Sequence, residues 1–427
     1  MCSVAYGDEV NVMLEKMKHR GPDETRVSGK LGMSRLSIID LKSEGLCLYE
    51  EDGVKLAFNG EIYNYKELKS ELGGEFRTSS DTEVLLRAYR QWGTSCLERF
   101  NGMYAFIIED GDTIFFARDV AGEKPLYYRE SPFGLASEAK ALNYDCKEVP
   151  PAHMGTYKDG KIVLKRYWRP KKRHIDILYA EKELEDLLED SIRLRTQADV
   201  PYGLYKSGGV DSTLISTFHD FRHKYTYHDE DFKEEFLRDF PDILWHLDYP
   251  VKSFSAFALW KLAQEAKNDG VRVVLSGEGA DELFGGYVRY VPNSLAREAQ
   301  TRFPSYKDMF PYDKDVNEQG WEEFNGNMQE LLRMGDRMAS AHGIENRCPF
   351  LDKRIIEFAF NLPPEAKIQG FDTKLILRRI LQRRMPKYQT EEKHGLYCSV
   401  NKWLNVKDKL DKEKYLSYQQ KLWNSQR

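Results

Sequence analysis

A glycine-rich loop reads Tyr205-Lys206-Ser207-Gly208-Gly209-Val210-Asp211-Ser212-Thr213. It follows a predicted strand at residues 201–205 and leads into a helix predicted to begin at Ser212. Small residues with free backbone N–H groups at a helix N-terminus form a binding site for an anion such as phosphate. The loop lacks the G-x-x-x-x-G-K-[ST] order of the P-loop of kinases, so it is not an anion site of that kind.

Strand and helix patterns alternate around this loop. The predicted elements are a helix at residues 180–196, strands at 201–205, 225–227 and 271–275, and helices from residue 212 and at 256–267. Such alternation predicts an α/β domain built on a parallel sheet. From about residue 289 onward the pattern is mostly helical.

The first 168 residues have a different pattern, rich in short strands. Strands are predicted at residues 31–40, 54–63, 113–118, 126–128 and 155–168, and helices at 64–72 and 81–92. Residues 169–174 are basic, contain a proline and lack periodicity, which is typical of a linker. We therefore predict two domains, at residues 1–168 and 179–427, joined by a linker at 169–178.

Composition excludes several classes of protein. The chain has 427 residues, a net charge of -5, 41% hydrophobic and 31% charged residues, which is ordinary for a soluble globular protein. No basic surplus favours nucleic acid or an anionic membrane. No apolar run reaches the roughly 18 residues of a membrane span, and the N-terminus does not resemble a signal peptide. The six scattered cysteines argue against a disulfide framework or zinc site, so we expect a reducing, cytoplasmic location.

Cys2 directly follows the initiator methionine. If Met1 is removed, Cys2 carries a thiol with a reference pKa of about 8.5 and an α-amine of about 7.7–8.0. Because these values differ by less than about one unit, one residue can supply both nucleophile and base. Taken alone, a plain buried thiol is the commoner explanation of a cysteine at this position.

Five ordered motifs accompany Cys2. They are His19-Arg20-Gly21-Pro22-Asp23, Arg35-Leu36-Ser37-Ile38-Ile39-Asp40, Phe58-Asn59-Gly60-Glu61-Ile62-Tyr63-Asn64, Ser80-Asp81-Thr82-Glu83 and Arg118-Asp119-Val120-Ala121-Gly122-Glu123-Lys124-Pro125-Leu126-Tyr127-Tyr128. Together they closely resemble the class II glutamine amidotransferase domain. The resemblance implies an N-terminal-nucleophile hydrolase fold, an α-β-β-α sandwich, for residues 1–168.

The same resemblance implies roles for individual residues. Cys2 would attack the amide of glutamine, while the Asn59 side chain and the Gly60 N–H would form the oxyanion hole. Glutamine would be bound by Arg35 at its α-carboxylate, by Glu61 and Asp81 at its α-ammonium, and by Ile38 and Ile39. Singly, each has a plainer explanation, since Arg35 would suit a surface and Asn59-Gly60 a hairpin turn. The family usually has glycine after the cysteine. Ser3 is small, so we expect it to be tolerated; the alternative is that it narrows the space around the thiol and slows glutamine hydrolysis.

A second signature reads Leu275-Ser276-Gly277-Glu278-Gly279-Ala280-Asp281-Glu282-Leu283-Phe284-Gly285-Gly286-Tyr287. With the loop at residues 205–213 it closely resembles asparagine synthetases and the related β-lactam synthetases, which use an ATP-pyrophosphatase domain. Residues 336–338, 345–352 and 373–378 also match that family.

This second resemblance implies a second set of site residues. Asp211 and Asp281 would hold Mg²⁺ on the phosphates, because hard cations prefer carboxylate oxygens. Glu278 would be an electrostatic or acid–base group, and Lys374 would neutralise charge on the phosphates. The implied ATP-binding residues are Tyr205, Ser207, Gly208, Gly209, Asp211, Ser212, Tyr227, Ser276 and Gly277.

The two resemblances cover nearly the whole chain and imply one reaction. Aspartate, glutamine, ATP and water would give asparagine, glutamate, AMP and diphosphate through an aspartyl-AMP intermediate, with ammonia passing between the sites. The alternatives are an amidotransferase for another carboxylate and a non-catalytic relative. The expected partners are these small molecules and a second copy of the chain in a homodimer, with neither nucleic acid nor membrane.

Two departures from the family lead to further expectations. Relatives usually carry an apolar residue where Lys206 stands, so we expect this lysine to reach the phosphates or a carboxylate; the alternative is that it bends to solvent. Relatives also usually have an extra helix and strand before residue 275. Their absence predicts a smaller sheet and weak discrimination among purine bases, with Tyr227 as the best match for the adenine contact.

Overall fold

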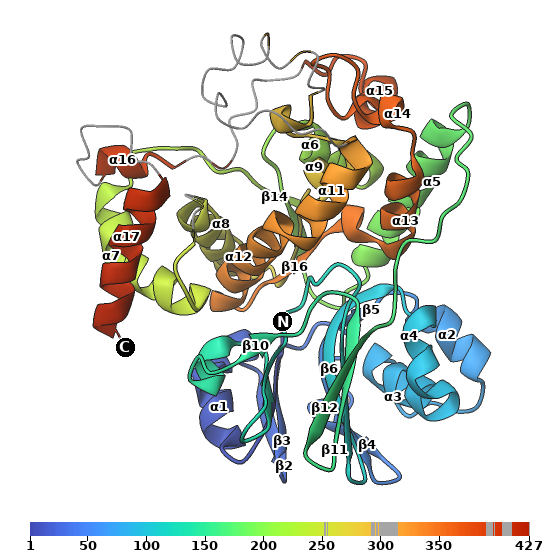
Figure 1. Ribbon diagram of the computed structural model, residues 1–427, viewed down its shortest axis with the longest axis vertical. Helices are drawn as coiled ribbons and strands as arrows, with labels where there is room; N and C mark the ends of the chain where they lie inside the picture. Colours follow the sequence, from blue (N-terminus) through green and yellow to red (C-terminus); the bar gives the residue numbers. More distant parts are fainter. Residues whose placement is uncertain are drawn as a thin grey trace.

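The chain folds into two layered halves that lie directly against each other (Figure 1). This computed structural model describes residues 1–427 except 252, 254, 292–294, 296–297, 299–314, 390–395, 397, 404–411 and 427. Strands between residues 3 and 166 form two antiparallel sheets, and strands between residues 202 and 347 form one parallel sheet. Among the described residues, no helix is both long enough and apolar enough to cross a membrane.

The first half is a sandwich of two six-stranded sheets. One sheet has the order β10-β8-β9-β1-β3-β2, with β1 (Ser3–Tyr6), β2 (Glu24–Ser28), β3 (Leu31–Arg35), β8 (Tyr127–Arg129), β9 (Gly134–Ala136) and β10 (Lys147–Glu148). The other has the order β12-β11-β7-β6-β5-β4, with β4 (Tyr49–Glu51), β5 (Val54–Ile62), β6 (Gly102–Asp110), β7 (Thr113–Arg118), β11 (His153–Lys158) and β12 (Lys161–Arg166). Helix α1 (Val10–Lys16) covers the first sheet, and α2 (Tyr65–Leu72), α3 (Asp81–Trp92) and α4 (Cys96–Arg99) cover the second.

Strand β6 shows why the sandwich has four layers. Its Ala105 and Ile107 join the core between the two sheets, whereas Tyr104, Phe106 and Ile108 join the core beneath the helices. Successive side chains of a strand point to opposite faces, so a strand buried on both faces reads as a continuous apolar run. The predicted α-β-β-α sandwich is confirmed.

The second half is built on a parallel sheet of order β14-β13-β15-β16, with β13 (Tyr202–Tyr205), β14 (His223–Tyr225), β15 (Val273–Leu275) and β16 (Glu345–Arg347). Its helices are α5 (Ala180–Arg195), α6 (Val210–Phe218), α7 (Lys233–Leu247), α8 (Ala256–Asn268), α9 (Ala280–Phe284), α11 (Val316–Asn325), α12 (Asn327–Ala341), α13 (Lys353–Asn361), α14 (Pro364–Lys367), α15 (Leu375–Arg384), α16 (Val400–Trp403) and α17 (Lys412–Gln426). The predicted α/β class is confirmed. Strand β14 forms one edge of this sheet.

Several predicted strand boundaries are wrong. The strand predicted at 225–227 is β14 and ends at Tyr225, and the strand predicted at 31–40 is β3 and ends at Arg35. The run at 155–168 is a hairpin, because Asp159 and Gly160 both have positive φ and turn the chain between β11 and β12. Strands β1, β2, β4, β6, β9, β10 and β16 were not predicted from the sequence.

Candidate active sites

Cys2 lies just before β1, and its backbone nitrogen is hydrogen-bonded to the side chain of Asn59. The Cys2 N–H donates to Asn59 Oδ1 at 2.9 Å. Burial raises the pKa of the Cys2 thiol, whose sulfur lies 3.9 Å from the carbonyl oxygen of Leu36. Met1 precedes it as a fully buried residue between the two halves. Removal of Met1 would therefore leave a free Cys2 amine already held by Asn59.

Asn59 and Gly60, on β5, have the geometry expected of an oxyanion hole. Asn59 Nδ2 is buried and has no hydrogen-bond partner among the described residues, which leaves a donor available beside Cys2. Gly60 has a φ of 144°, and a Cβ there would lie 2.0 Å from the carbonyl oxygen of Met103. Only glycine fits this backbone, which argues against the simple hairpin-turn explanation.

Arg35 lies at the end of β3 and fixes the loop that follows it. Its Nη2 donates to the carbonyl oxygens of Ile39 and Asp40, each at 3.0 Å. Ile38 is buried and accepts from the N–H of Asp199 at 2.9 Å, while Ile39 is half-buried. Arg35 is 9% exposed, so it is not a plain surface arginine.

The two carboxylates predicted to hold an α-ammonium are both buried. Asp81 begins α3, accepts from the Ile62 N–H at 2.8 Å, and has its pKa raised to about 6 by burial. Glu61 Oε1 lies 3.0 Å from a guanidinium nitrogen of Arg347, which belongs to the other half. Burial raises the pKa of Glu61 well above its usual range, and the charge of Arg347 opposes this. The sequence prediction did not include Arg347.

The glycine-rich loop lies between β13 and α6. Gly209 is the N-cap of α6 and Gly208 has a φ of 76°. The Ser207 N–H donates to Ser212 Oγ at 3.1 Å, and the Tyr388 hydroxyl donates to the Gly208 carbonyl oxygen at 2.9 Å. These bonds hold the loop open ahead of the helix N-terminus, which is the arrangement that binds phosphate.

Lys374 connects the two predicted metal ligands. Its ammonium lies 2.8 and 2.6 Å from the two carboxylate oxygens of Asp211 and 2.7 Å from Oδ1 of Asp281. Lys374 adopts a left-handed backbone with φ of 54° at the start of α15. Lys374 is 3% exposed, so it is a buried lysine and not one on the exposed face of a helix.

The donor set fits Mg²⁺ in part. The carboxylates of Asp211 and Asp281 both contact the ammonium of Lys374. The described residues contain no group of three or more His, Cys, Asp or Glu side chains placed to hold a metal ion. Mg²⁺ in nucleotide sites is commonly bound by one or two carboxylates, with phosphate oxygens and water completing the octahedron. Asp211 and Asp281 therefore suit a metal that arrives with a polyphosphate.

Both loops and Glu278 face one pocket of about 200 Å³. Of the predicted ATP-binding residues, those lining it are Tyr205, Ser207, Asp211, Ser212, Tyr227, Ser276 and Gly277, whereas Gly208 and Gly209 do not. Gly277 is required by space, because a Cβ there would lie 2.9 Å from the Cβ of Asp211. Burial raises the pKa of Glu278 to about 7, near the value that suits a general base at neutral pH.

Lys206 also lines this pocket and is half-buried. No ion pair to a described carboxylate is formed by its ammonium, in contrast to Lys374. The geometry leaves its charge available to a ligand in the pocket.

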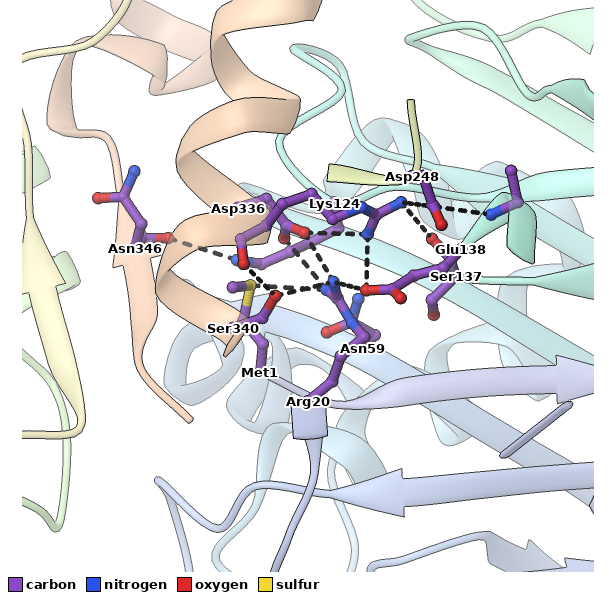
Figure 2. Close-up of polar contacts among 12 residues, drawn as sticks. Met1, Arg20, Asn59, Lys124, Ser137, Glu138, Asp248, Asp336, Ser340 and Asn346 are labelled. Carbon is purple, nitrogen blue, oxygen red and sulfur yellow. Dashed lines mark hydrogen bonds and ion pairs between the residues drawn. The ribbon is translucent and has the colours of Figure 1, made fainter. Parts of the chain in front are cut away.

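A buried ionic cluster joins the two halves beside Cys2 (Figure 2). Arg20 forms two hydrogen bonds with Asp336 of α12, at 2.8 and 3.1 Å, and a third with Glu138 at 3.0 Å. Its Nε donates to the Cys2 carbonyl oxygen at 3.1 Å. Arg337 binds Glu138 and Asp248 at 3.1 and 3.0 Å. The sequence showed Arg20 and residues 336–338 as motif members but gave no sign that they meet.

Comparison with known proteins gives the same two parts. Residues 2–151 match the family described as glutamine amidotransferase domain, and residues 183–228 and 221–417 match the family described as asparagine synthase. A glutamine-hydrolyzing asparagine synthetase 1 of Bacillus subtilis is 28% identical, over 92% of this chain and 84% of the relative. A probable glutamine-hydrolyzing asparagine synthetase of Schizosaccharomyces pombe is 32% identical, over 86% and 75%. Asparagine synthetase B of Escherichia coli is 31% identical, over 87% and 75%.

Proposed function

Because this chain belongs to the family of glutamine-hydrolysing asparagine synthetases, we propose that it converts aspartate, glutamine, ATP and water to asparagine, glutamate, AMP and diphosphate. The observation that carries the proposal is the convergence of Asp211, Asp281 and Glu278 on one pocket, with Lys374 paired to both aspartates, in a chain whose other half presents Cys2 beside a free amide donor. The domains that perform these steps are residues 1–168 and 179–427, joined by a linker at 169–178.

In the first half, the Cys2 thiolate attacks the side-chain amide carbon of glutamine. The Cys2 amine takes the thiol proton and passes it to the leaving nitrogen, which departs as ammonia. Asn59 Nδ2 and the Gly60 N–H stabilise the oxyanion of the tetrahedral intermediate. Water then hydrolyses the thioester and releases glutamate. Arg35, Glu61 and Asp81, with Ile38 and Ile39, orient the substrate.

In the second half, a carboxylate oxygen of aspartate attacks the α-phosphorus of ATP, and diphosphate leaves. Ser207, Gly208, Gly209 and Ser212 bind the phosphates at the N-terminus of α6, and Lys374 offsets the charge that develops on the leaving group. Asp211 and Asp281 would hold Mg²⁺, which supplies charge neutralisation when bound. Ammonia then attacks the acyl carbon, AMP leaves, and Glu278 accepts the proton that the amine loses.

A single assay tests the proposal. The full chain is incubated with ATP, Mg²⁺ and glutamine labelled with ¹⁵N in its side-chain amide, against a panel of carboxylates that includes aspartate. The expected result is AMP release with aspartate and ¹⁵N in the amide of asparagine. Faster AMP release with another carboxylate would show that aspartate is not the acceptor. If no carboxylate supports AMP release, the chain is a non-catalytic relative.

The remaining expectations are part of the same proposal. The enzyme acts on small molecules in the cytoplasm and forms a homodimer. Light scattering of the purified chain should give the mass of two copies of the 49.9 kDa protomer. The mass of a single copy would contradict the homodimer.

A further inference from the structure

Two side chains outside the predicted site converge on one oxygen of Glu278. Asn346 Nδ2 donates to Glu278 Oε2 at 3.1 Å, and the Cys348 thiol approaches the same oxygen at 3.5 Å. Both oxygens of the carboxylate lie against Gly335 of α12, where a Cβ would be 2.8 Å from Oε1 and 3.1 Å from Oε2. The carboxylate is therefore held by two donors on one side, and a glycine leaves room for it on the other.

The residues that hold Glu278 are themselves fixed by the first half of the chain. The Cys348 N–H donates to Glu123 Oε2 at 3.3 Å, and Lys124 Nζ donates to the Asn346 carbonyl oxygen at 3.3 Å. Glu123 and Lys124 lie in a loop whose backbone N–H groups donate to the buried carboxylate of Asp119. Each positioning residue thus contacts the first half through its backbone and Glu278 through its side chain.

We propose that Asn346 and Cys348 are positioning residues for Glu278, holding its Oε2 so that Oε1 accepts the proton from the attacking ammonia. This inference rests on the proposed function and assigns two residues that it does not use. Both donors stabilise the ionised carboxylate, which a general base requires. The other titratable groups near Glu278 include Glu282 of α9, Asp336 of α12 and Tyr205 of β13, and the two carboxylates oppose its ionisation.

The physical consequence is a shift in the pH at which Glu278 ionises. Burial already raises its pKa to about 7, and the two hydrogen bonds act against that rise. A hydrogen bond to a charged group stabilises the ionised form, so losing the amide donor should raise the pKa of Glu278 by about one unit. A thiol is a weaker donor, so losing it should shift the pKa by about half as much.

The test compares kcat for ammonia-dependent AMP release across pH 6–9 in the wild type and in Asn346→Leu, Cys348→Val and Cys348→Ser. Dividing the kcat of each variant by the wild-type kcat at the same pH removes the effect of the titration of ammonia itself. We expect the acidic limb of the kcat–pH profile to shift to higher pH, by about one unit for Asn346→Leu and about half a unit for Cys348→Val. Cys348→Ser keeps a donor and should restore the wild-type limb. KM for ATP and glutaminase turnover should stay unchanged.

Controls separate positioning from general damage. Cys146→Val changes a half-buried cysteine outside this cluster and should leave the profile unmoved. Variants that lose rate equally at every pH would show that Asn346 and Cys348 only support the fold, which overturns the inference. Absence of AMP release by the wild type would instead overturn the proposed function.

Discussion

A guanidinium nitrogen of Arg347 lies 3.0 Å from Oε1 of Glu61, so a residue of the second half pairs with a carboxylate of the predicted glutamine site. The neighbours of Arg347 along β16 also meet the first half. Glu345 lies 4.0 Å from the Met1 amine, and Asn346 accepts from Lys124. Strand β16 therefore contacts the predicted glutamine site through Arg347 and Glu278 through the neighbouring Asn346, so one strand touches both predicted sites.

The first prediction concerns this ion pair. In Arg347→Gln, Glu61 loses the charge that opposes the effect of burial, so its pKa rises further and its ionised form is disfavoured. A neutral carboxyl binds an ammonium poorly, so KM for glutamine should rise at least about tenfold, or about 1.4 kcal/mol. Because Glu61 ionises again at higher pH, this penalty should shrink as pH increases. Glutamate release measured at pH 7 and pH 9 checks both points.

Arg347→Lys is the matched control for this variant, since it keeps the charge and should retain most glutamine binding. Arg347 is fully buried, so both variants should also unfold at lower temperature in a thermal melt. A glutamine KM that is unchanged in folded Arg347→Gln would show that Glu61 does not need this arginine.

The second prediction separates the two nitrogen sources. Cys2→Ala removes the nucleophile but leaves Asn59, Gly60 and the whole second half in place. Glutamine-dependent asparagine synthesis should fall to background, whereas ammonia-dependent synthesis should stay within about twofold of wild type. Amino-acid analysis of the products with each nitrogen source measures both. Equal loss of the two activities would contradict the division of labour between the halves.

Motif residues near one another in the sequence were the easiest part of both sites to predict. Ser207, Asp211 and Ser212 lie within one loop, and local rules for helix N-termini are enough to indicate an anion site there. Lys374 lies 163 residues from Asp211 in the chain. The family resemblance implied that Lys374, Asp211 and Asp281 belong to one phosphate site, but it did not predict that the lysine pairs with both aspartates. Periodicity carries no information about such pairs.

The missed elements have a physical cause in each case. Strand β6 is buried on both faces, so its run of apolar residues lacks the alternation that marks a half-buried strand. Strand β16 has the sequence Glu-Asn-Arg, which no strand propensity favours. Its polar side chains are buried because each meets a partner from another part of the chain, and such partners are set by the tertiary fold.

The third prediction tests the phosphate site. In Asp281→Asn the carboxylate pair around Lys374 loses one charge, so a cation accompanying the phosphates would bind more weakly. AMP release should fall at least about a hundredfold with either nitrogen source, by about 2.7 kcal/mol. Glutamate release by Cys2 should persist. The two products are measured in the same reaction, and normal AMP release from the variant would refute the assignment of Asp281.

The fourth prediction concerns Lys206. Its side chain lines the nucleotide pocket, and among described residues it has no carboxylate partner. Lys206→Leu should raise KM for ATP about tenfold with a smaller change in kcat, because a charge that binds phosphate in the ground state is lost. Lys224→Leu is the control, since that exposed lysine of β14 does not line the pocket. An unchanged KM in Lys206→Leu would mean that the lysine points to solvent.

The last prediction concerns the base of the nucleotide. Beyond the phosphate loops the lining of the pocket is mostly aromatic and aliphatic, and includes Tyr225, Tyr227, Leu259, Leu262, Tyr287, Met328, Leu331, Leu332 and Leu396. Tyr227 also borders a second hollow of about 370 Å³. Rings and aliphatic side chains stack on any purine without distinguishing its hydrogen-bonding edge. GTP should therefore support ammonia-dependent synthesis within about tenfold of ATP, a difference of about 1.4 kcal/mol. The ratio of kcat/KM for the two nucleotides measures this directly. A preference for ATP above about a thousandfold would show that backbone groups of this shortened segment still read the adenine edge.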